Sequence, residues 1–364
     1  MNATSVCFVV HEARRTGPPL YALGVVGWLA ERADLDLDLG VVLARGGPLE
    51  GAFARLCPTR VWEADEAGAR GLLERADVVV VNTAISTQVL RRAGCRPPRV
   101  VTHVHELEVG LRYWLPAEDH RWMLDVTDRF LVGPDCAADN LVRHHGVDRA
   151  RIGQVPYFVP AGSGPGRRDE VRRHLGVGPD TVLVGACGAR EWRKAPDLFA
   201  HVAWHARRLA PDVDLRFCWV GASPPSGPHW DEDADLALLD LGDRLRYEAD
   251  QDDIDPWLAA FDLYALTSRE DDFPLACLTA ASFGVPPVTF DGGGIADLVR
   301  HGGGGTVVPY PRTEALAGAL VSFARDPERR AEHGRRLRDH VAEHHRLEQT
   351  GARVLDELRA VAAR

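Results

Sequence analysis

Short runs of apolar residues alternate with segments of helical spacing through the first 160 residues of the chain. Uninterrupted apolar runs predict buried strands, and residues 20–29 repeat their apolar positions with the period of a helix. Strands that alternate with helices in this way indicate a parallel sheet covered by helices on both faces. The predicted strands are residues 5–10, 38–43, 77–81, 99–104 and 129–132.

The same alternation starts again after a segment rich in proline and glycine, residues 156–168, which is typical of a linker. A chain of 364 residues is also longer than one hydrophobic core usually supports. We therefore predict two Rossmann-like domains, 1–160 and 161–340, whose parallel sheets face a central cleft, and a C-terminal helix, 341–364, that packs back on the first domain. The elements predicted in the second half are strands 181–185, 215–220, 244–248, 261–266 and 286–290, helices 195–209 and 274–283, and a mostly helical region from residue 313 onward.

The composition excludes several classes of protein. A formal charge of −10 argues against nucleic acid as the main partner. The sequence has no apolar stretch near the roughly 18 residues of a membrane-spanning helix, and its first ten residues do not resemble a secretory signal. The seven cysteines are scattered without a C-x-x-C pair, which favours free thiols in a reducing cytosol over disulfides or zinc. We expect a cytoplasmic protein.

Of the 43 basic residues, 42 are arginines and one, Lys194, is a lysine. A bias of this strength is typical of drift in a GC-rich genome, and drift spares lysine only where a compact ammonium group is needed or by chance. A nicotinamide enzyme is disfavoured, because the loop after the first strand holds one central glycine and not the G-x-G-x-x-G fingerprint.

The most informative run is residues 268–288, SREDDFPLACLTAASFGVPPV. A strand ends in an acidic loop, a helix begins near Pro274 and stops at Gly284, and the next strand follows Pro286 and Pro287. Carboxylates just before a helix can cap its N-terminus or accept hydrogen bonds from sugar hydroxyls. For Asp272 we expect the capping role.

This run resembles the signature of glycosyltransferase family 4, the retaining GT-B enzymes, which is usually written S-x-x-E-G-F-x-L-x-x-x-E-A-x-x-x-G-x-P-V. Four further segments resemble landmarks of the family in the expected order. They are the segment 11–20 (HEARRTGPPL), the segment 103–107 (HVHEL), the segment 185–199 (GACGAREWRKAPDLF) and the segment 291–299 (DGGGIADLV).

The resemblance implies a GT-B fold and a retaining, metal-independent glycosyltransferase without an enzymic nucleophile. It needs no cofactor, and its substrate is a UDP- or GDP-linked sugar. Departure of a diphosphate leaves negative charge that the protein must stabilise, and the adjacent cations Arg193 and Lys194 have the chemistry to do so. With them we expect His105 and Asp271 to be catalytic, His105 by hydrogen-bonding the donor sugar or its phosphate. The expected donor-binding residues are Gly17, Arg190, Glu270, Phe273, Pro274, Leu275, Thr279, Gly292, Gly293 and Gly294, and the expected acceptor-binding residues are Glu12, Thr16 and Glu106.

Two positions depart from the pattern. Alignment on Phe273 puts Asp271 where the family has the glutamate that contacts sugar hydroxyls, and Thr279 where it has the glutamate that contacts the ribose. Aspartate keeps the charge with a shorter reach, whereas threonine offers only a hydroxyl. Either the nucleotide is held differently in this chain, or the chain has lost some activity.

The acceptor is less well defined. Residues 1–160 contain 18 arginines, no lysine and 20 acidic residues, without a basic cluster for anionic membranes. We therefore expect a soluble glycoside or natural-product intermediate as the acceptor, and do not favour peripheral membrane binding. A sugar-nucleotide epimerase of the same fold and a nucleotide-sugar-binding protein with impaired catalysis are the alternatives. The adjacent histidines 144–145 and 344–345 are predicted to lie on the surface.

Overall fold

The computed structural model describes residues 3–32, 34–160, 167–221 and 237–363, so residues 161–166 of the predicted linker lie outside the described residues. The chain forms two compact units. Unit 1 comprises Met1–Ala161 together with His345–Arg364, and unit 2 comprises Gly162–His344. The predicted boundaries, 160/161 and 340/341, are close to these limits.

Unit 1 is built on a seven-stranded parallel sheet with the strand order β3-β2-β1-β4-β5-β6-β7. The inner strands are buried except at their first residues, because helices cover both faces of the sheet. Strand Val78–Asn82, for example, is the run VVVVN with every residue buried. The strands are β1 (Thr4–Val10), β2 (Leu37–Leu43), β3 (Thr59–Val61), β4 (Val78–Asn82), β5 (Arg99–His103), β6 (Arg129–Val132) and β7 (Ile152–Gln154).

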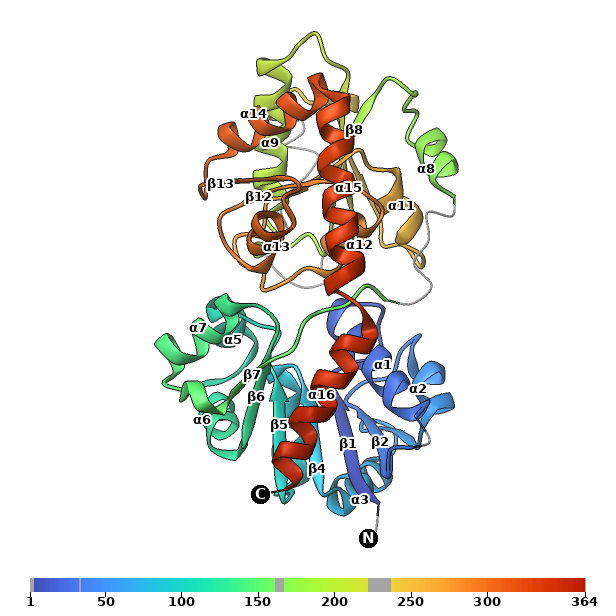
Figure 1. Ribbon diagram of the computed structural model, residues 1–364, viewed down its shortest axis with the longest axis vertical. Coiled ribbons are helices and arrows are strands. Elements are labelled where there is room, and N and C mark those ends of the chain that lie inside the picture. The colour runs from blue at the N-terminus through green and yellow to red at the C-terminus, as the bar shows by residue number, and fades with distance from the viewer. Residues whose placement is uncertain (1–2, 33, 161–166, 222–236, 364) are drawn as a thin grey trace. The chain divides into compact units, whose positions relative to one another are not determined.

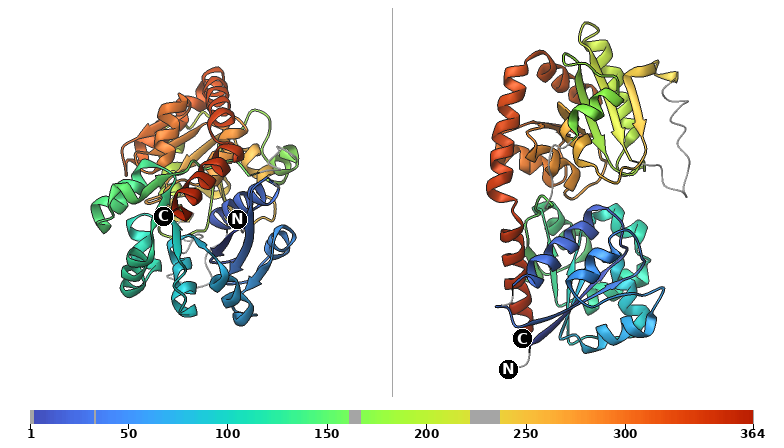
Figure 2. Two further views of the ribbon diagram at one scale, coloured as in Figure 1. Left: turned by 60° about the horizontal axis from the view of Figure 1, so that its bottom comes forward. Right: turned by 90° about the vertical axis from the view of Figure 1, so that its right-hand side faces the viewer.

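The helices of unit 1 lie beside this sheet (Figure 1). Their apolar residues join those of the strands in the hydrophobic core. The C-terminal helix α16 lies against α1 and contacts β4 and β5, which Figure 2 shows from two further directions. The approach to α1 is close, because a Cβ atom on Gly351 of α16 would lie 2.2 Å from the Trp28 ring. The helices are α1 (Gly17–Ala30), α2 (Glu50–Leu56), α3 (Glu66–Arg75), α4 (Thr87–Ala93), α5 (Glu108–Trp114), α6 (Ala117–Val126), α7 (Asp135–His145) and α16 (Leu347–Ala362), with short 3₁₀ turns at Ala84–Ser86 and Arg149–Arg151.

Unit 2 repeats the plan with a six-stranded parallel sheet in the order β10-β9-β8-β11-β12-β13. Its largest core cluster joins β8, β9 and β11 to the apolar faces of α9 and α14. The strands are β8 (Val182–Cys187), β9 (Leu215–Val220), β10 (Leu245–Glu248), β11 (Leu263–Leu266), β12 (Pro287–Phe290) and β13 (Thr306–Val308). The helices are α8 (Arg168–His174), α9 (Pro196–Leu209), α11 (Asp255–Ala260), α12 (Leu275–Ser282), α13 (Gly294–Gly302), α14 (Thr313–Arg325) and α15 (Pro327–His344), with a 3₁₀ turn at Gly242–Arg244.

Both sheets have the doubly wound topology that the alternating pattern predicts, and the fold-class prediction of two Rossmann-like α/β halves is confirmed. Three strands were missed by the sequence pattern: β3, β7 and β13. Each has only three residues, and the outer strands β3 and β7 carry a polar residue within them. Runs of this length give no periodicity that could be recognised.

The expected cap of α12 was wrong. The helix begins at Leu275 with Pro274 as its N-cap residue, and no side chain caps it. Asp272 contributes its backbone oxygen, which accepts a hydrogen bond of 2.6 Å from the Gly294 N–H at the start of α13. Among the described residues, no helix combines the length and the apolar character that crossing a membrane requires.

Candidate functional site

Each sheet has a point where the strand order reverses, between β1 and β4 in unit 1 and between β8 and β11 in unit 2. Ligands of doubly wound sheets bind at the carboxyl ends of the strands next to such a point. In unit 2, the loop after β8 carries Arg193 and Lys194, and the loop after the neighbouring β11 carries Asp271. In unit 1, the loop after β1 leads to Thr16 and Gly17, and β4 ends at Asn82.

The carboxylate of Asp271 is the centre of the unit 2 cluster. Lys194 Nζ donates to its Oδ2, Arg193 Nη1 donates to its Oδ1 over 3.3 Å, and Ser268 Oγ donates to Oδ2 over 3.3 Å. The Asp271 side chain is only 8% exposed, whereas Lys194 and Arg193 are 15% and 28% exposed. The two cations are thus anchored by a buried carboxylate and still reach the surface of the unit.

In this cluster, neighbouring opposite charges stabilise the charged forms of Asp271 and Arg193. Burial alone raises the pKa of Asp271, but the charges of Lys194 and Arg193 outweigh burial, and the pKa lies below its ordinary value. Burial also lowers the pKa of Arg193, and the neighbouring carboxylates of Asp271 and Glu191 reverse that effect. Asp271 and Arg193 are therefore charged at neutral pH, and an anion that approaches the cluster meets Arg193 and Lys194, both fixed by the Asp271 carboxylate.

Further contacts hold the two loops of unit 2 together. Arg269 makes a two-pronged ion pair with Asp197, with distances of 2.9 and 2.5 Å, and its guanidinium lies 5.2 Å from the centre of the Trp192 ring. Its backbone N–H donates to the Arg193 carbonyl over 2.8 Å. Ala195, directly after Lys194, has φ +60°, a strained value for a residue with a side chain. The position of Lys194 is therefore set from both loops.

The glycine loop after β12 packs on the same acidic loop. Gly293 has φ +73°, and a Cβ atom there would lie 2.2 Å from the Asp271 carbonyl oxygen, so this position requires glycine. The N–H of Gly294 is already bound by the Asp272 carbonyl. The loop of Gly292, Gly293 and Gly294 thus lies beside Asp271, with the Gly294 donor used internally.

The structure places the other predicted donor residues as follows. Arg190 lies toward β10, where its Nη1 donates to the Glu248 carbonyl over 3.4 Å and its guanidinium lies 5.5 Å from the centre of the Tyr247 ring. The Glu270 carbonyl accepts from Arg193 Nη1 over 3.2 Å. Phe273, Pro274 and Thr279 are buried and Leu275 is half-buried. These residues adjoin the Asp271 loop, whereas Arg190 is at another part of the strand edge.

In unit 1, His105 lies in a buried group of aromatic and polar side chains. Its Nδ1 is 2.7 Å from the Tyr157 hydroxyl and its Nε2 is 3.0 Å from Asn82 Oδ1. The His103 ring stacks on it with the ring centres 4.1 Å apart. Burial, followed by the nearby histidines, holds the pKa of His105 well below its ordinary value, so the ring is neutral. Both of its nitrogens are used within the protein.

The predicted acceptor residues lie around the same strand ends. Glu106 Oε2 accepts from the backbone N–H groups of His105 and Ala84, over 2.9 and 3.2 Å. A hydrogen bond from His11, followed by the charges of His11 and Arg14, outweighs burial and lowers the pKa of Glu12. Thr16 and Gly17 begin α1, and the Thr16 side chain does not cap that helix.

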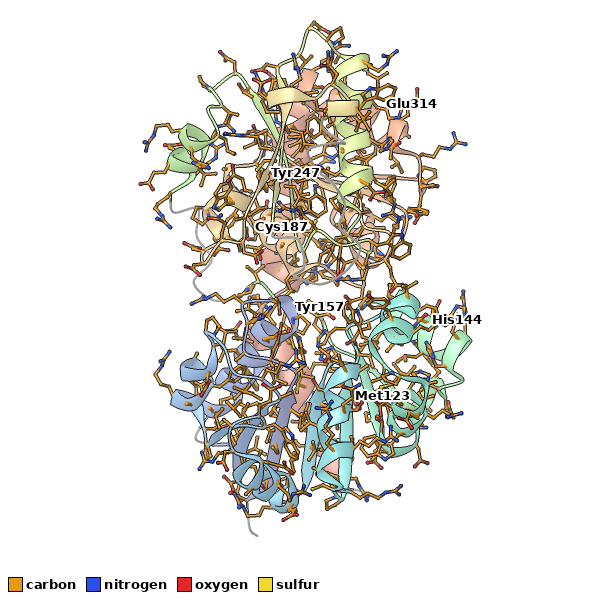
Figure 3. All side chains as sticks on the ribbon, turned by 180° about the vertical axis from the view of Figure 1, so that it is seen from behind. Met123, His144, Tyr157, Cys187, Tyr247 and Glu314 are labelled. Carbon is orange, nitrogen blue, oxygen red and sulfur yellow. The ribbon has the colours of Figure 1, made fainter. Side chains whose placement is uncertain are left out.

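The prediction for the paired histidines was correct for their first members and wrong for His145. His144, labelled in Figure 3, and His344 are exposed. The His145 side chain is 6% exposed, with Nε2 2.9 Å from Glu108 Oε2 and its ring 4.7 Å from that of His120. His345 is half-buried, and its Nδ1 donates to the Tyr157 carbonyl over 2.8 Å. Adjacent positions at a helix end point in different directions, so one of a pair can be buried.

The described residues that touch predicted site residues without having been identified from the sequence include Glu191, Ser268, Asn82 and Tyr157. Ser268 is the first residue of the run 268–288, and Asn82 is the polar residue at the carboxyl end of an apolar strand. Both could therefore have been identified from the sequence. Tyr157, labelled in Figure 3, lies between the described strands and helices and has no such signal in the sequence.

In sequence, the chain is similar to known glycosyltransferases. Residues 178–326 match the family described as glycosyl transferases group 1. A D-inositol 3-phosphate glycosyltransferase of Rhodococcus erythropolis is 28% identical over 351 residues, which cover 91% of this chain and 74% of that protein. The enzyme of the same name from Saccharomonospora viridis is 32% identical over 222 residues, 59% of this chain and 51% of its own length. The chain thus spans only about half the length of several relatives it matches.

Solved structures share the fold at low sequence identity. Anabaena Alr3699/HepE in complex with UDP-glucose has a TM-score of 0.82 at 17% identity, covering 98% of this chain and 99% of that chain. WaaG, a glycosyltransferase involved in lipopolysaccharide biosynthesis, has a TM-score of 0.74 at 15% identity, covering 95% and 98%.

Proposed function

Because this chain is a group 1 glycosyltransferase of the GT-B fold, we propose that it moves a sugar from a nucleoside diphosphate to a hydroxyl group of a soluble acceptor. The observation that supports this proposal most strongly is the cluster of Arg193, Lys194 and Asp271 at the carboxyl edge of the unit 2 sheet. Two cations held by a buried carboxylate suit an anion that gains charge as a bond breaks.

In the proposed reaction, Arg193 and Lys194 contact the diphosphate and stabilise the charge that develops as the bond between phosphate and sugar breaks. Asp271 holds both cations and accepts hydrogen bonds from hydroxyls of the donor sugar. The sugar is transferred with retention, the acceptor attacking on the face that the diphosphate leaves, and the departing phosphate takes the acceptor proton. No metal ion takes part, because the protein's own cations stabilise the leaving group.

The donor is a UDP- or GDP-sugar, and a UDP-glucose complex of a protein with the same fold supports testing UDP-sugars first. The proposed acceptor is a small glycoside or another polyhydroxylated molecule, bound by unit 1 near Glu12, Thr16 and Glu106. Several relatives bear the name D-inositol 3-phosphate glycosyltransferase, so this polyol phosphate belongs in the first acceptor panel.

The test measures turnover of UDP- and GDP-sugars with each acceptor, and the anomeric configuration of the product by NMR. We expect Lys194→Ala to lower kcat roughly 100-fold or more. The matched control is Arg335→Ala, which removes a cation from the exposed face of α15 in the same unit, and should change nothing. Full activity of Lys194→Ala would refute the role given to the Asp271 cluster, and an inverted product would refute retention.

The same assay tests metal independence and the two alternatives. A chelator such as EDTA should leave the rate unchanged, and loss of activity that magnesium or manganese restores would contradict the proposal. Conversion of the donor in the absence of any acceptor would indicate an epimerase. Calorimetric binding of UDP-sugars without turnover on any acceptor would indicate a binding protein, as the Thr279 substitution suggests.

A further inference from the structure

Asn82 fixes the hydrogen-bonding pattern around His105. Its Nδ2 lies 2.9 Å from the carbonyl oxygen of Pro18, in the first turn of α1. A carbonyl oxygen only accepts, so the Asn82 amide group must point its NH₂ toward Pro18 and its oxygen toward His105. The side chain is 2% exposed, so water is not an alternative partner that would allow it to turn.

This orientation decides which nitrogen of His105 carries the proton. Asn82 Oδ1 accepts only, so His105 Nε2, 3.0 Å away, must be the N–H donor. A neutral imidazole has one N–H, so Nδ1 carries a lone pair. The Tyr157 hydroxyl, 2.7 Å from Nδ1, is then the donor. A single carbonyl of α1 thus determines the proton positions along the row Pro18, Asn82, His105 and Tyr157.

The surroundings of His105 favour the neutral ring. Its titratable neighbours are His103, stacked at 4.1 Å, Tyr21 at 5.3 Å and Tyr157 at 5.7 Å between ring centres, together with Glu106, which binds the His105 backbone N–H, and His11. Burial, followed by the charges of His103 and His11, disfavours an imidazolium at His105 and holds its pKa well below the ordinary value.

The same row of hydrogen bonds reaches both places where the chain leaves unit 1. Tyr157 lies four residues before Ala161, the last residue of the first segment of unit 1. Its carbonyl accepts from Nδ1 of His345, the residue at which the chain enters unit 1 again. The Val159 N–H donates to the His345 carbonyl over 3.2 Å, and Thr350 Oγ1 donates to the Pro156 carbonyl over 2.8 Å. At the Asn82 end of this row of hydrogen bonds, the next residue, Thr83, has φ +85° and ψ 145°. This is a strained conformation for threonine, which the surrounding packing must maintain.

We propose that Asn82 and Tyr157 are positioning residues that hold His105 as the neutral tautomer with the proton on Nε2, and that tie this histidine to both connections between the units. In this state neither ring nitrogen is available to a substrate. Both partners are buried, but Tyr157 lies outside the described helices and strands whereas Asn82 belongs to β4, so Tyr157 is the partner that gives way. The nitrogen then released, Nδ1, accepts a hydrogen bond, so His105 binds a sugar hydroxyl and not a phosphate oxygen. The catalytic part of this inference rests on the proposed function, whereas the tautomer does not.

The tautomer is measured directly by ¹⁵N NMR of the histidine rings in the full chain. The His105 signals are assigned from their loss in His105→Gln. We expect protonated Nε2 and unprotonated Nδ1 in the wild type. In Asn82→Leu the acceptor for Nε2 is gone, and the Tyr157 hydroxyl can accept from Nδ1, so the proton should move to Nδ1. Asn82→Asp keeps an acceptor in the same place and should restore the Nε2 proton.

Tyr157→Phe supplies the second test, which holds even if Asn82→Leu does not fold. It should keep the Nε2 proton but shift the Nδ1 resonance, because the lone pair loses its donor. The matched control is Tyr21→Phe. This buried tyrosine lies beside the same ring, and its hydroxyl has no hydrogen-bond partner among the described residues, so the His105 signals should stay as in the wild type.

In kinetics we expect kcat to fall roughly tenfold in Tyr157→Phe and in Asn82→Leu, with little change in Tyr21→Phe and with partial recovery in Asn82→Asp. A wild-type ring protonated on Nδ1, or on both nitrogens at neutral pH, would overturn the assignment even in an active enzyme. An Nε2 tautomer in a chain that transfers no sugar would refute the proposed function alone. Unchanged kcat in Tyr157→Phe would refute the positioning role.

Discussion

Asp271 illustrates how a shorter side chain changes a site. Its carboxylate receives two cations and the Ser268 hydroxyl while remaining 8% exposed. Aspartate has one methylene fewer than the glutamate of the related motif, and its carboxylate binds both Arg193 and Lys194. In the proposed function, the diphosphate of the donor therefore meets cations that are already oriented.

Replacing the carboxylate tests that orientation. Asp271→Asn leaves Lys194 and Arg193 close together without a counter-charge, so we expect kcat/KM to fall roughly 100-fold and the free energy of unfolding to fall by about 2 kcal/mol at neutral pH. The pKa of Asp271 is lowered in the folded state, so its stabilising contribution is present above the ordinary pKa of an aspartate and is lost as the pH falls through the folded-state value.

Urea unfolding of wild type and Asp271→Asn between pH 7 and pH 3 provides the measurement. The difference in unfolding free energy should be constant from pH 7 to about pH 5 and then shrink toward pH 3. A difference that grows on acidification would contradict the ion-pair account.

Some of these residues could be predicted from the sequence and others could not, for physical reasons. Lys194 stands out because 42 of 43 basic residues are arginine, and Asp271 because it lies in a recognisable run between strand and helix. Tyr157 contacts His105 across 52 positions of the chain from a segment without a pattern. Contacts of that kind depend on tertiary packing, which no local periodicity encodes.

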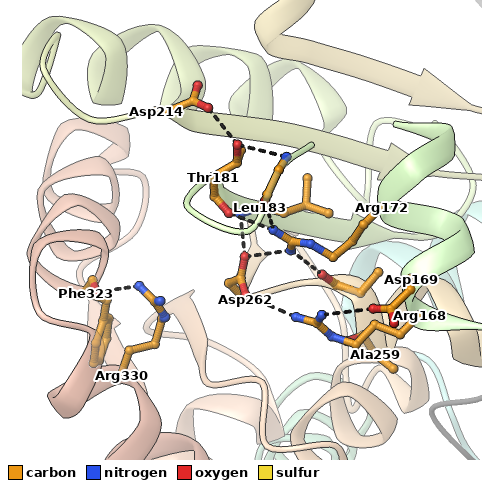
Figure 4. Close-up of polar contacts among 12 residues, drawn as sticks. Arg168, Asp169, Arg172, Thr181, Leu183, Asp214, Ala259, Asp262, Phe323 and Arg330 are labelled. Atoms are coloured by element: carbon orange, nitrogen blue, oxygen red, sulfur yellow. Dashed lines mark hydrogen bonds and ion pairs between the residues drawn. The ribbon is translucent and has the colours of Figure 1, made fainter. Parts of the chain in front are cut away.

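At the scale of single elements, helix α8 is attached to the sheet of unit 2 by a buried arginine. Arg172 donates to the carbonyls of Ala260, Gly178 and Thr181 and to Asp262 Oδ2, over 2.8 to 3.0 Å, as Figure 4 shows in part. Asp262 also accepts from the Leu183 N–H over 2.8 Å. The guanidinium thus joins the helix to the starts of two neighbouring strands, at the edge opposite the Asp271 cluster.

Loss of this arginine removes the 2.9 Å ion pair of Asp262, which keeps only Arg168 at 3.5 Å and the Leu183 N–H, and it removes one donor from each of the three carbonyls. Arg172→Met should lower the free energy of unfolding of unit 2 by roughly 3 kcal/mol without changing KM, because the network lies at the other edge of the sheet. Its neighbour Arg173 is exposed on the same helix, so Arg173→Met is the control and should cost less than about 0.5 kcal/mol. Equal losses in the two variants, measured by urea unfolding, would contradict this view of Arg172.

The helix boundaries agree best with the sequence where a proline marks the start of a helix or a glycine follows its end. Helix α9 begins at Pro196 and α12 is followed by Gly284 with φ +82°, as proline at a helix start and glycine after a helix end predict. The three-residue strands β3, β7 and β13 gave no such signal. Each adds one row of backbone hydrogen bonds at the edge of its sheet, and these bonds require no particular side chains.

For the whole molecule, the important feature is that α16 belongs to unit 1, although it follows unit 2 in the sequence. Its Glu357, 4% exposed, receives Nε and Nη2 of Arg129 over 2.7 and 3.1 Å. A Cβ atom on Gly153 of β7 would lie 2.6 Å from Glu357 Oε1, so a side chain there would displace the Glu357 carboxylate. The buried apolar residues of the helix include Val354, Leu355, Leu358 and Val361.

Truncation after His344 should therefore unfold unit 1 and leave unit 2 intact. Burial of those four apolar side chains contributes roughly 6–12 kcal/mol, which is comparable to the whole stability of a domain, about 5–15 kcal/mol. Limited proteolysis with mass spectrometry should find the truncated chain cut throughout residues 1–160, with a fragment close to 167–344 surviving. Protection of residues 1–160 would show that unit 1 does not depend on α16.

This arrangement has a consequence for biosynthesis. Unit 2 is contiguous in the chain, so it can acquire its structure while translation continues. Synthesis of unit 1 begins before that of unit 2, but unit 1 lacks α16 until residues 345–364, which follow unit 2, have been made. The unit that is begun first is thus completed second, and until then the surface of its sheet that α16 covers is exposed.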